Sequence, residues 1–360
     1  TAFGKKFSFL FAWSRVTVTQ TGSIALLAYI AGDYLTELLP LGTYSSAFYA
    51  AAIVISLTLV NVSGIRFGTG FQKLFMALQI VGILIIVLTG FLVEPTITDQ
   101  LPVQVVHQSV SPNSSIGLAF IFVLLTFGGW NEAAYISAEL KTGSRKMALL
   151  LVVSIVIITV VYLLMNLAFL NVLGLSGMAA SEAVGVDMMR ATLGDKGVIL
   201  IGLLVSLFAL TSLNTTIFTG ARASYALGKD FTPLAFLGRW DKEKSSPVNS
   251  LILQGVIALL LIIFGLFTRN GFEAMVDFTA PVFWFFFLCT GLSLFVLRRK
   301  YPDVPRPFKV PLYPVIPFLF VAFCGYMLYS SLSVTGTGAL VGVALLLVGW
   351  GVSFFQKTTE

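Results

Sequence analysis

Long apolar stretches dominate this 360-residue sequence and limit what it can fold into. A helix that crosses the roughly 30 Å hydrocarbon core of a bilayer needs about 20 largely apolar residues, and about ten stretches reach that length. Only 11% of the residues are charged, and the mean hydropathy is +0.95. An ordinary soluble domain carries roughly 25% charged residues, because its surface faces water. The sequence therefore predicts an all-α integral membrane protein.

The predicted spans are helices, because isolated strands would leave backbone polar groups unpaired in lipid. In chain order they are 7–38, 45–62, 68–92, 116–140, 148–173, 197–225, 249–267, 275–297, 316–332 and 336–355. Ala183, Val186, Met189 and Leu193 recur at helical spacing between two of the spans, which predicts a short helix lying on the membrane surface. We treat 1–360 as a single polytopic domain.

The basic residues indicate how the chain is oriented. Lysine and arginine residues gather at alternate span ends, and only Arg190, Lys196 and Arg269 fall at the opposite ends. The positive-inside rule makes the basic ends cytoplasmic, and an even number of spans places both termini there. The net charge of +6 thus marks orientation in a membrane and does not predict nucleic-acid binding.

Enzyme chemistry finds little support in the sequence. The single histidine, His107, lies in a predicted outer loop, and Cys289 and Cys324 lie inside apolar runs. The sequence has neither a His-Glu-x-x-His zinc motif nor a nucleotide-binding Gly-Lys-Ser/Thr loop. We therefore predict no catalytic residues, metal site or cofactor, and transport is the remaining function.

The span 116–140 contains polar and flexible residues that do not suit a lipid-facing helix. Gly128 and Gly129 each weaken a helix by about 1 kcal/mol relative to alanine, and Asn131 and Glu132 follow directly. Interrupted helices of this kind form substrate sites in transporters, where freed N–H and C=O groups bind charged ligand groups. Close packing of a neighbouring helix against the glycines is the alternative. Glu132 is either a functional acid or a structural partner of Arg15.

Other polar groups occur at similar depth in three further spans. Ser212 to Thr216 include an asparagine and three hydroxyl residues, and 68–92 contains Gln79. The polar residues of 7–38 are Thr17, Thr19, Gln20, Thr21 and Ser23. Hydroxyl groups in such helices either bond back to their own carbonyl groups or line a polar pathway. Several polar patches at one depth favour an aqueous pathway through the bundle.

Four segments resemble the amino acid–polyamine–organocation superfamily, in particular bacterial relatives of the L-type amino acid transporters. Residues 297–314, LRRKYPDVPRPFKVPLYP, are similar to the loop between that family's tenth and eleventh spans. FGGWN at 127–131 with AELK at 138–141 resembles its sixth span, SLNTTIFTGAR at 212–222 its eighth, and WSRVTVTQTGSIA at 13–25 its third. The resemblance covers essentially the whole chain.

This resemblance implies a LeuT-like inverted-repeat helical bundle with about ten of twelve transmembrane helices present. Residues 7–92 would be three spans of an incomplete first repeat, 116–297 the five spans of the second, and 316–355 two peripheral spans. The family's first span carries a Gly-Ser-Gly turn for the substrate carboxylate, and no such turn is found here. The chain is therefore expected to lack the first two helices.

The resemblance also implies the residues of the substrate site. They are Phe127, Gly128, Gly129, Trp130, Asn131, Asn214, Thr19 and Ser23. Gln79, Glu132 and Thr215 are candidate positions for coupling; Gln79 stands where the family often has a lysine, which argues against a lysine-based mechanism. The loop 40–44 lacks the cysteine through which eukaryotic members join a glycoprotein subunit, so no disulfide-linked heavy chain is expected.

The expected function is that of a secondary amino-acid permease of the inner (cytoplasmic) membrane, working by alternating access. Two alternatives stay open: an inert fragment without transport activity, and a permease for amines or polyamines. A membrane enzyme is the least supported class.

Overall fold

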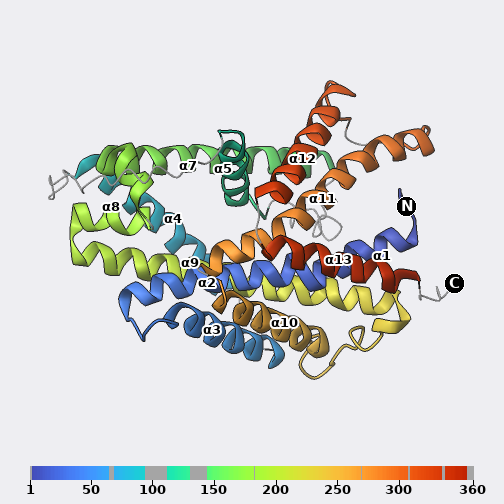
Figure 1. The fold of residues 1–360 in the computed structure, drawn as a ribbon, viewed down its shortest axis with the longest axis horizontal. Helices are drawn as coiled ribbons and strands as arrows, with labels where there is room; N and C mark the ends of the chain where they lie inside the picture. Colours follow the sequence, from blue (N-terminus) through green and yellow to red (C-terminus); the bar gives the residue numbers. More distant parts are fainter. Residues whose placement is uncertain are drawn as a thin grey trace. The chain divides into compact units, whose positions relative to one another are not determined.

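A computed structural model describes residues 2–64, 69–93, 112–129, 144–181, 183–268, 270–306, 309–334 and 337–354 of the chain. These residues are almost entirely helical (Figure 1). The elements are α1 Lys5–Ser14, η1 Arg15–Thr19, α2 Gln20–Leu38, α3 Ser45–Val62, α4 Thr69–Leu92, α5 Pro112–Thr126, α7 Ser144–Ala180, α8 Val184–Leu193, α9 Asp195–Asp230, η2 Thr232–Leu234, α10 Val248–Leu266, α11 Gly271–Lys300, α12 Val315–Val334 and α13 Thr337–Phe354.

The described helices agree with the predicted spans, except that residues 130–140 of span 116–140 lie outside the described residues. Predicted span 45–62 coincides with α3, and span 7–38 is covered by α1, η1 and α2, which follow one another from Lys5 to Leu38. Within the described ranges, seven helices are long and apolar enough to cross a membrane: α3, α4, α7, α9, α10, α11 and α12. α13 is a shorter apolar helix.

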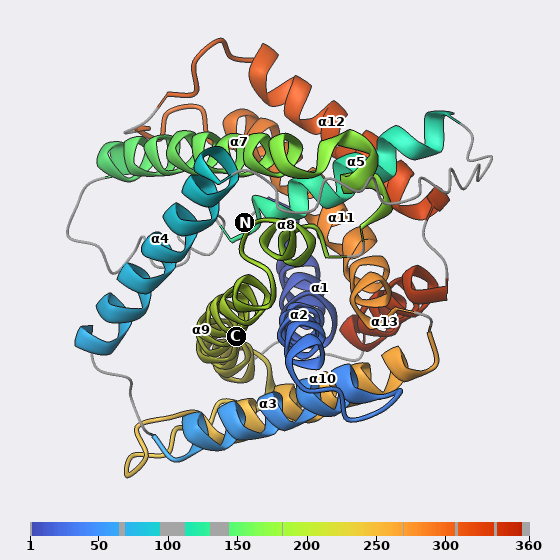
Figure 2. The ribbon, with the colours of Figure 1, turned by 90° about the vertical axis from the view of Figure 1, so that its left-hand side faces the viewer.

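The described residues fall into two compact units. The first takes in 1–76, 202–297 and 321–360, and the second takes in 77–201 and 298–320. In the first unit α2 packs against α3 and α10, α3 packs against α10, and α1 packs against α13 (Figure 2). Trp13 of α1 donates its indole N–H to the carbonyl of Leu345 in α13, with an N···O distance of 3.0 Å. Phe9, Val16 and Leu227 form a buried core cluster in this unit.

The second unit is built around α7, which changes direction at Gly174, where φ is 65°. Span 148–173 was predicted to end one residue before that position. α4 lies close to α7 at Gly90, where an added Cβ would lie 2.6 Å from the Cβ of Ala168. Asn171 of α7 donates to the Gly90 carbonyl at 2.9 Å. Most side chains of α7 are exposed in the structure, and 0% of its most apolar window is buried, as expected of a helix that faces lipid.

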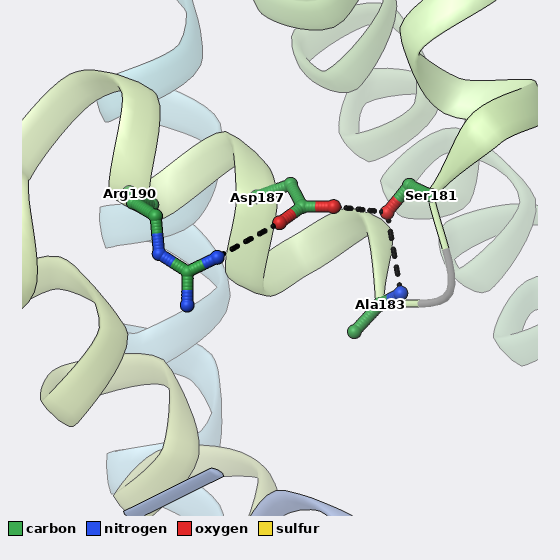
Figure 3. A network of polar contacts seen from close by, with 4 residues as sticks. All are labelled: Ser181, Ala183, Asp187 and Arg190. Carbon is green, nitrogen blue, oxygen red and sulfur yellow. Dashed lines mark hydrogen bonds and ion pairs between the residues drawn. The ribbon is translucent and has the colours of Figure 1, made fainter. Parts of the chain in front are cut away.

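The short helix predicted between the spans is present as α8. Its Val186, Met188 and Met189 are buried within the protein, so its apolar face packs against the second unit instead of only resting on a membrane. A polar network fixes the turn before it (Figure 3): Ser181 donates to Asp187 at 2.6 Å, and the Ala183 N–H donates to Ser181 at 3.2 Å. Asp187 also pairs with Arg190 at 3.2 Å, one helical turn later.

Candidate functional site

Span 116–140 is predicted to break at Gly128 and Gly129; α5 ends directly before these residues in the second unit, and residues 130–140 of the span lie outside the described residues. α5 ends at Thr126, and residues 127–129 form a turn. The Gly128 N–H donates to the Leu125 carbonyl at 2.9 Å, a three-residue bond that tightens the helix end. Gly129 has a φ of 100°, a backbone conformation that costs glycine little and other residues much more. The glycine pair thus provides the conformation that ends the helix.

Close packing does not explain these glycines within the described part of the chain. A Cβ added at Gly129 would meet no described atom within 4 Å. At Gly128 it would meet only the carbonyl of Leu125, at 2.9 Å and 4.0 Å, which belongs to the same helical turn. The requirement at Gly129 is therefore one of backbone conformation.

Tyr162 of α7 supports the end of α5. Its hydroxyl donates to the Thr126 carbonyl at 2.7 Å, and its ring meets the Phe127 ring edge-on, with centroids 5.2 Å apart at 74°. The Thr126 hydroxyl donates to the Val123 carbonyl at 2.6 Å. The last carbonyl of the helix thus has a donor from a second helix, which a helix end in a membrane requires.

Tyr162→Phe is expected to loosen this helix end, because the Thr126 carbonyl loses its donor while the ring contact with Phe127 is kept. The expected loss is about 1 kcal/mol. Thermal unfolding in detergent measures it as a lower melting temperature. Tyr329→Phe is the matched control, since Tyr329 is 69% exposed and removal of its hydroxyl should leave the melting temperature unchanged. Equal melting temperatures for the two variants would contradict the supporting role.

Three of the predicted site residues, Trp130, Asn131 and Glu132, lie outside the described residues. Gln79 lies half-buried in α4, in the same unit as α5. A hollow of about 390 Å³ in that unit is lined by Phe91, Leu167, Leu170 and Asn171, and it includes none of the predicted site residues.

In the first unit, Thr19 and Ser23 occupy one face of the helix at the π-helical segment. Thr19 is the last residue of η1 and is half-buried, while Ser23 is exposed. The Ser23 hydroxyl donates to the Thr19 carbonyl at 2.8 Å. π-Helical turns inside longer helices occur frequently at functional sites.

Asn214 and Thr215 differ in what they contact. The Asn214 Oδ1 accepts a hydrogen bond from the Asn61 Nδ2 of α3 at 2.8 Å, so this amide joins two helices. Thr215 is exposed within the unit and donates to the Thr211 carbonyl at 3.0 Å. Thr216 likewise donates to Ser212 at 2.9 Å. The threonine hydroxyl groups thus bond back to their own helix, one of the two interpretations open from the sequence, and their oxygens can still accept hydrogen bonds.

A buried polar junction joins Arg15 and Gln20 to the α9 backbone at Thr216. Gln20 and Thr216 directly follow the predicted residues Thr19 and Thr215, and the sequence analysis did not predict these contacts. Arg15 Nη2 donates to Gln20 Oε1 at 2.9 Å, and Gln20 Nε2 donates to the Thr216 carbonyl of α9 at 2.8 Å. Gln254 Nε2 of α10 donates to the neighbouring Ile217 carbonyl at 2.6 Å. The sequence offers two signals for it: Arg15, a charge inside an apolar span and a candidate partner of Glu132, and Gln20, one of the polar residues of the same span.

The predicted site residues that the structure describes carry hydroxyl and amide groups, which suit hydrogen bonding to a polar ligand. Among the described residues, no three His, Cys, Asp or Glu side chains are grouped so that they could hold a metal ion. Thr19, Ser23, Asn214 and Thr215 lie in the first unit, whereas Gln79 and 127–129 lie in the second.

Comparison with known proteins identifies the family. A family model described as "Amino acid permease" matches residues 1–354. The chain belongs to this amino acid permease family. Its members are permeases and not enzymes, and with its apolar helices the chain is a multi-pass membrane protein of the LeuT-like fold.

Curated relatives agree with this family. The chain is 30% identical over 334 residues to the mouse (Mus musculus) b(0,+)-type amino acid transporter 1, covering 89% of the chain and 66% of the relative. It is 27% identical over 338 residues to the human (Homo sapiens) protein of the same name, covering 91% and 67%. It is also 27% identical over 370 residues to the mouse (Mus musculus) large neutral amino acids transporter small subunit 2, covering 98% and 66%. The chain thus spans about 66% of the length of these relatives.

Proposed function

We propose that the protein to which these residues belong is a secondary amino-acid permease that works by alternating access. The observation that carries the proposal is the end of α5 at Thr126, inside a predicted span, followed by a turn with a positive φ at Gly129. In membrane transporters, the ends of interrupted helices present backbone N–H and C=O groups, with their dipoles, to a charged substrate. Membership of the amino acid permease family and the names of the relatives support an amino acid as that substrate.

The proposed substrate site comprises the turn at 127–129 with Trp130 and Asn131 after it, together with Thr19, Ser23 and Asn214. A zwitterionic ligand needs acceptors for its ammonium group and donors for its carboxylate. Hydroxyl oxygens and carbonyl groups are acceptors, and an asparagine Nδ2 is a donor that suits a carboxylate. Gln79, Glu132 and Thr215 are the positions proposed for coupling to an ion or to exchange.

The proposed location is the inner (cytoplasmic) membrane, with both termini on the cytoplasmic side. The clusters of basic residues at alternate span ends support this orientation. No disulfide-linked heavy chain is proposed, because the segment between α2 and α3 contains no cysteine. Cys289 and Cys324 lie within α11 and α12 as free thiols.

A thermal-shift screen against the twenty amino acids tests the proposal. It should use the 360-residue chain and, where it is longer, the complete product of the gene. A ligand that binds only the folded state stabilises it by about 2.7 kcal/mol at a hundredfold excess over its dissociation constant. We expect a subset of amino acids to raise the melting temperature and their decarboxylated amines to leave it unchanged. A shift with amines or polyamines alone would replace the amino-acid assignment, and no shift with either class would overturn it.

A further inference from the structure

A buried arginine inside the predicted span 7–38 is an unusual feature of the first unit. Arg15 is 8% exposed and lies ten residues after Lys5, which corresponds to about 15 Å along the helix, roughly half of the hydrocarbon core. Charged groups at this depth are costly and mark functional positions more often than structural ones. The question is therefore what Arg15 does there.

The π-helical segment η1 explains how Arg15 meets Gln20. In an α-helix, two residues five positions apart point about 140° away from each other. Here the Gln20 N–H bonds to the Arg15 carbonyl across a π turn, and the wider turn brings the two side chains together. The result is the 2.9 Å bond from Arg15 Nη2 to Gln20 Oε1.

This bond leaves the Gln20 amide with a fixed direction. With Oε1 held by the guanidinium group, Nε2 donates to the Thr216 carbonyl of α9, two residues after Asn214 and one after Thr215. Gly220 lies one helical turn after Thr216, and its missing side chain leaves space for Gln20. A Cβ added at Gly220 would lie 2.5 Å from Gln20 Cγ and 2.7 Å from Gln254 Oε1. Side chains from α2 and α10 thus both hold the α9 backbone next to Asn214 and Thr215.

We propose that Arg15 and Gln20 are positioning residues for the substrate site. The π turn sets Arg15 against Gln20, and Gln20 holds the α9 backbone at Thr216, which fixes where Asn214 and Thr215 lie. This inference rests on the proposed function, and it adds two residues that touch no substrate and act through α9. The positioning of Asn214 and Thr215 is the reason we assign to the buried charge of Arg15.

Three variants separate the two bonds. Gln20→Met removes both, and Arg15→Met removes only the first. Gln20→Glu keeps an acceptor for Arg15 but, as a carboxylate, cannot donate to the Thr216 carbonyl. Asn171→Leu is the control, because it deletes an amide-to-carbonyl bond of the same chemistry between two helices of the second unit, 2.9 Å to Gly90.

The first readout is affinity for the amino acid that gives the largest shift in the screen above. We expect each of the three variants to raise its dissociation constant about tenfold, and Arg15→Met combined with Gln20→Met to add nothing further, because both act through one bond. Asn171→Leu should lower the melting temperature without changing the dissociation constant. If Gln20→Glu and Arg15→Met lowered the melting temperature but left the dissociation constant unchanged, the junction would only stabilise the fold, and the positioning role would be wrong.

The second readout needs no substrate, so it keeps this inference separable from the proposed function. In protein whose Cys289 and Cys324 are replaced by alanine, the rate at which a small methanethiosulfonate reagent labels Thr215→Cys reports the position of that face of α9. We expect Arg15→Met and Gln20→Met to change the rate at least threefold and Asn171→Leu to leave it unchanged. Equal labelling rates in the Thr215→Cys parent and in its three variants would overturn the positioning role, even where the wild type binds amino acids. Changed rates in a protein that binds none would uphold the junction and reject the permease.

Discussion

Gly129→Val is expected to weaken amino-acid binding by roughly a hundredfold. Gly129 has a φ of 100°, which a β-branched residue reaches only under strain, and the turn it forms ends α5 at Thr126. Strain of this kind costs up to about 3 kcal/mol, which corresponds to roughly a hundredfold loss in affinity if the turn must form for binding. The measurement is the dissociation constant of the amino acid found in the thermal-shift screen.

Gly325→Val is the control for this substitution. Gly325 lies in α12, and a Cβ added there meets no described atom within 4 Å. The control variant should bind with wild-type affinity. If Gly129→Val also did so, the interrupted helix would not be part of the substrate site.

Gly220→Ala is the second substitution with a large expected effect. The added methyl group would lie 2.5 Å from Gln20 Cγ and 2.7 Å from Gln254 Oε1, and both side chains are held by hydrogen bonds to α9. Overpacking of this kind costs about 1 to 3 kcal/mol, which outweighs the roughly 1 kcal/mol that alanine gains over glycine in a helix. We expect a lower melting temperature in detergent.

Gly325→Ala separates packing from helix propensity. It makes the same exchange inside a helix but meets open space among the described residues, so it should leave the melting temperature equal or slightly higher. A Gly220→Ala protein as stable as Gly325→Ala would show that the α9 junction tolerates displacement, and the positioning role of Gln20 would then lose its basis.

The spans could be predicted from the sequence because the physics that defines them is local. A run of apolar residues of sufficient length has one outcome in a membrane, so α3 and α10 begin and end within a residue of the predicted bounds. The helix break was predictable for the same reason, since two adjacent glycines report a backbone preference without reference to any neighbour.

The contacts between helices could not be predicted in this way. The bond from Gln20 to the Thr216 carbonyl joins residues 196 positions apart, and that from Asn61 to Asn214 joins residues 153 positions apart. No periodic pattern in the sequence indicates which distant residues form such pairs. The π turn at 15–19 was also missed, because its residues differ little in type from those of an ordinary helix.

Counterflow in proteoliposomes tests the central claim that this protein carries amino acids through a site at the interrupted helix. Vesicles loaded with unlabelled amino acid, at millimolar concentration, are diluted into a trace of the same amino acid carrying a radiolabel. Transport through the proposed site predicts transient accumulation of label in wild-type and Gly325→Val vesicles and none with Gly129→Val. Accumulation that persists undiminished with Gly129→Val, or its absence from the wild type for all twenty amino acids, would contradict the claim.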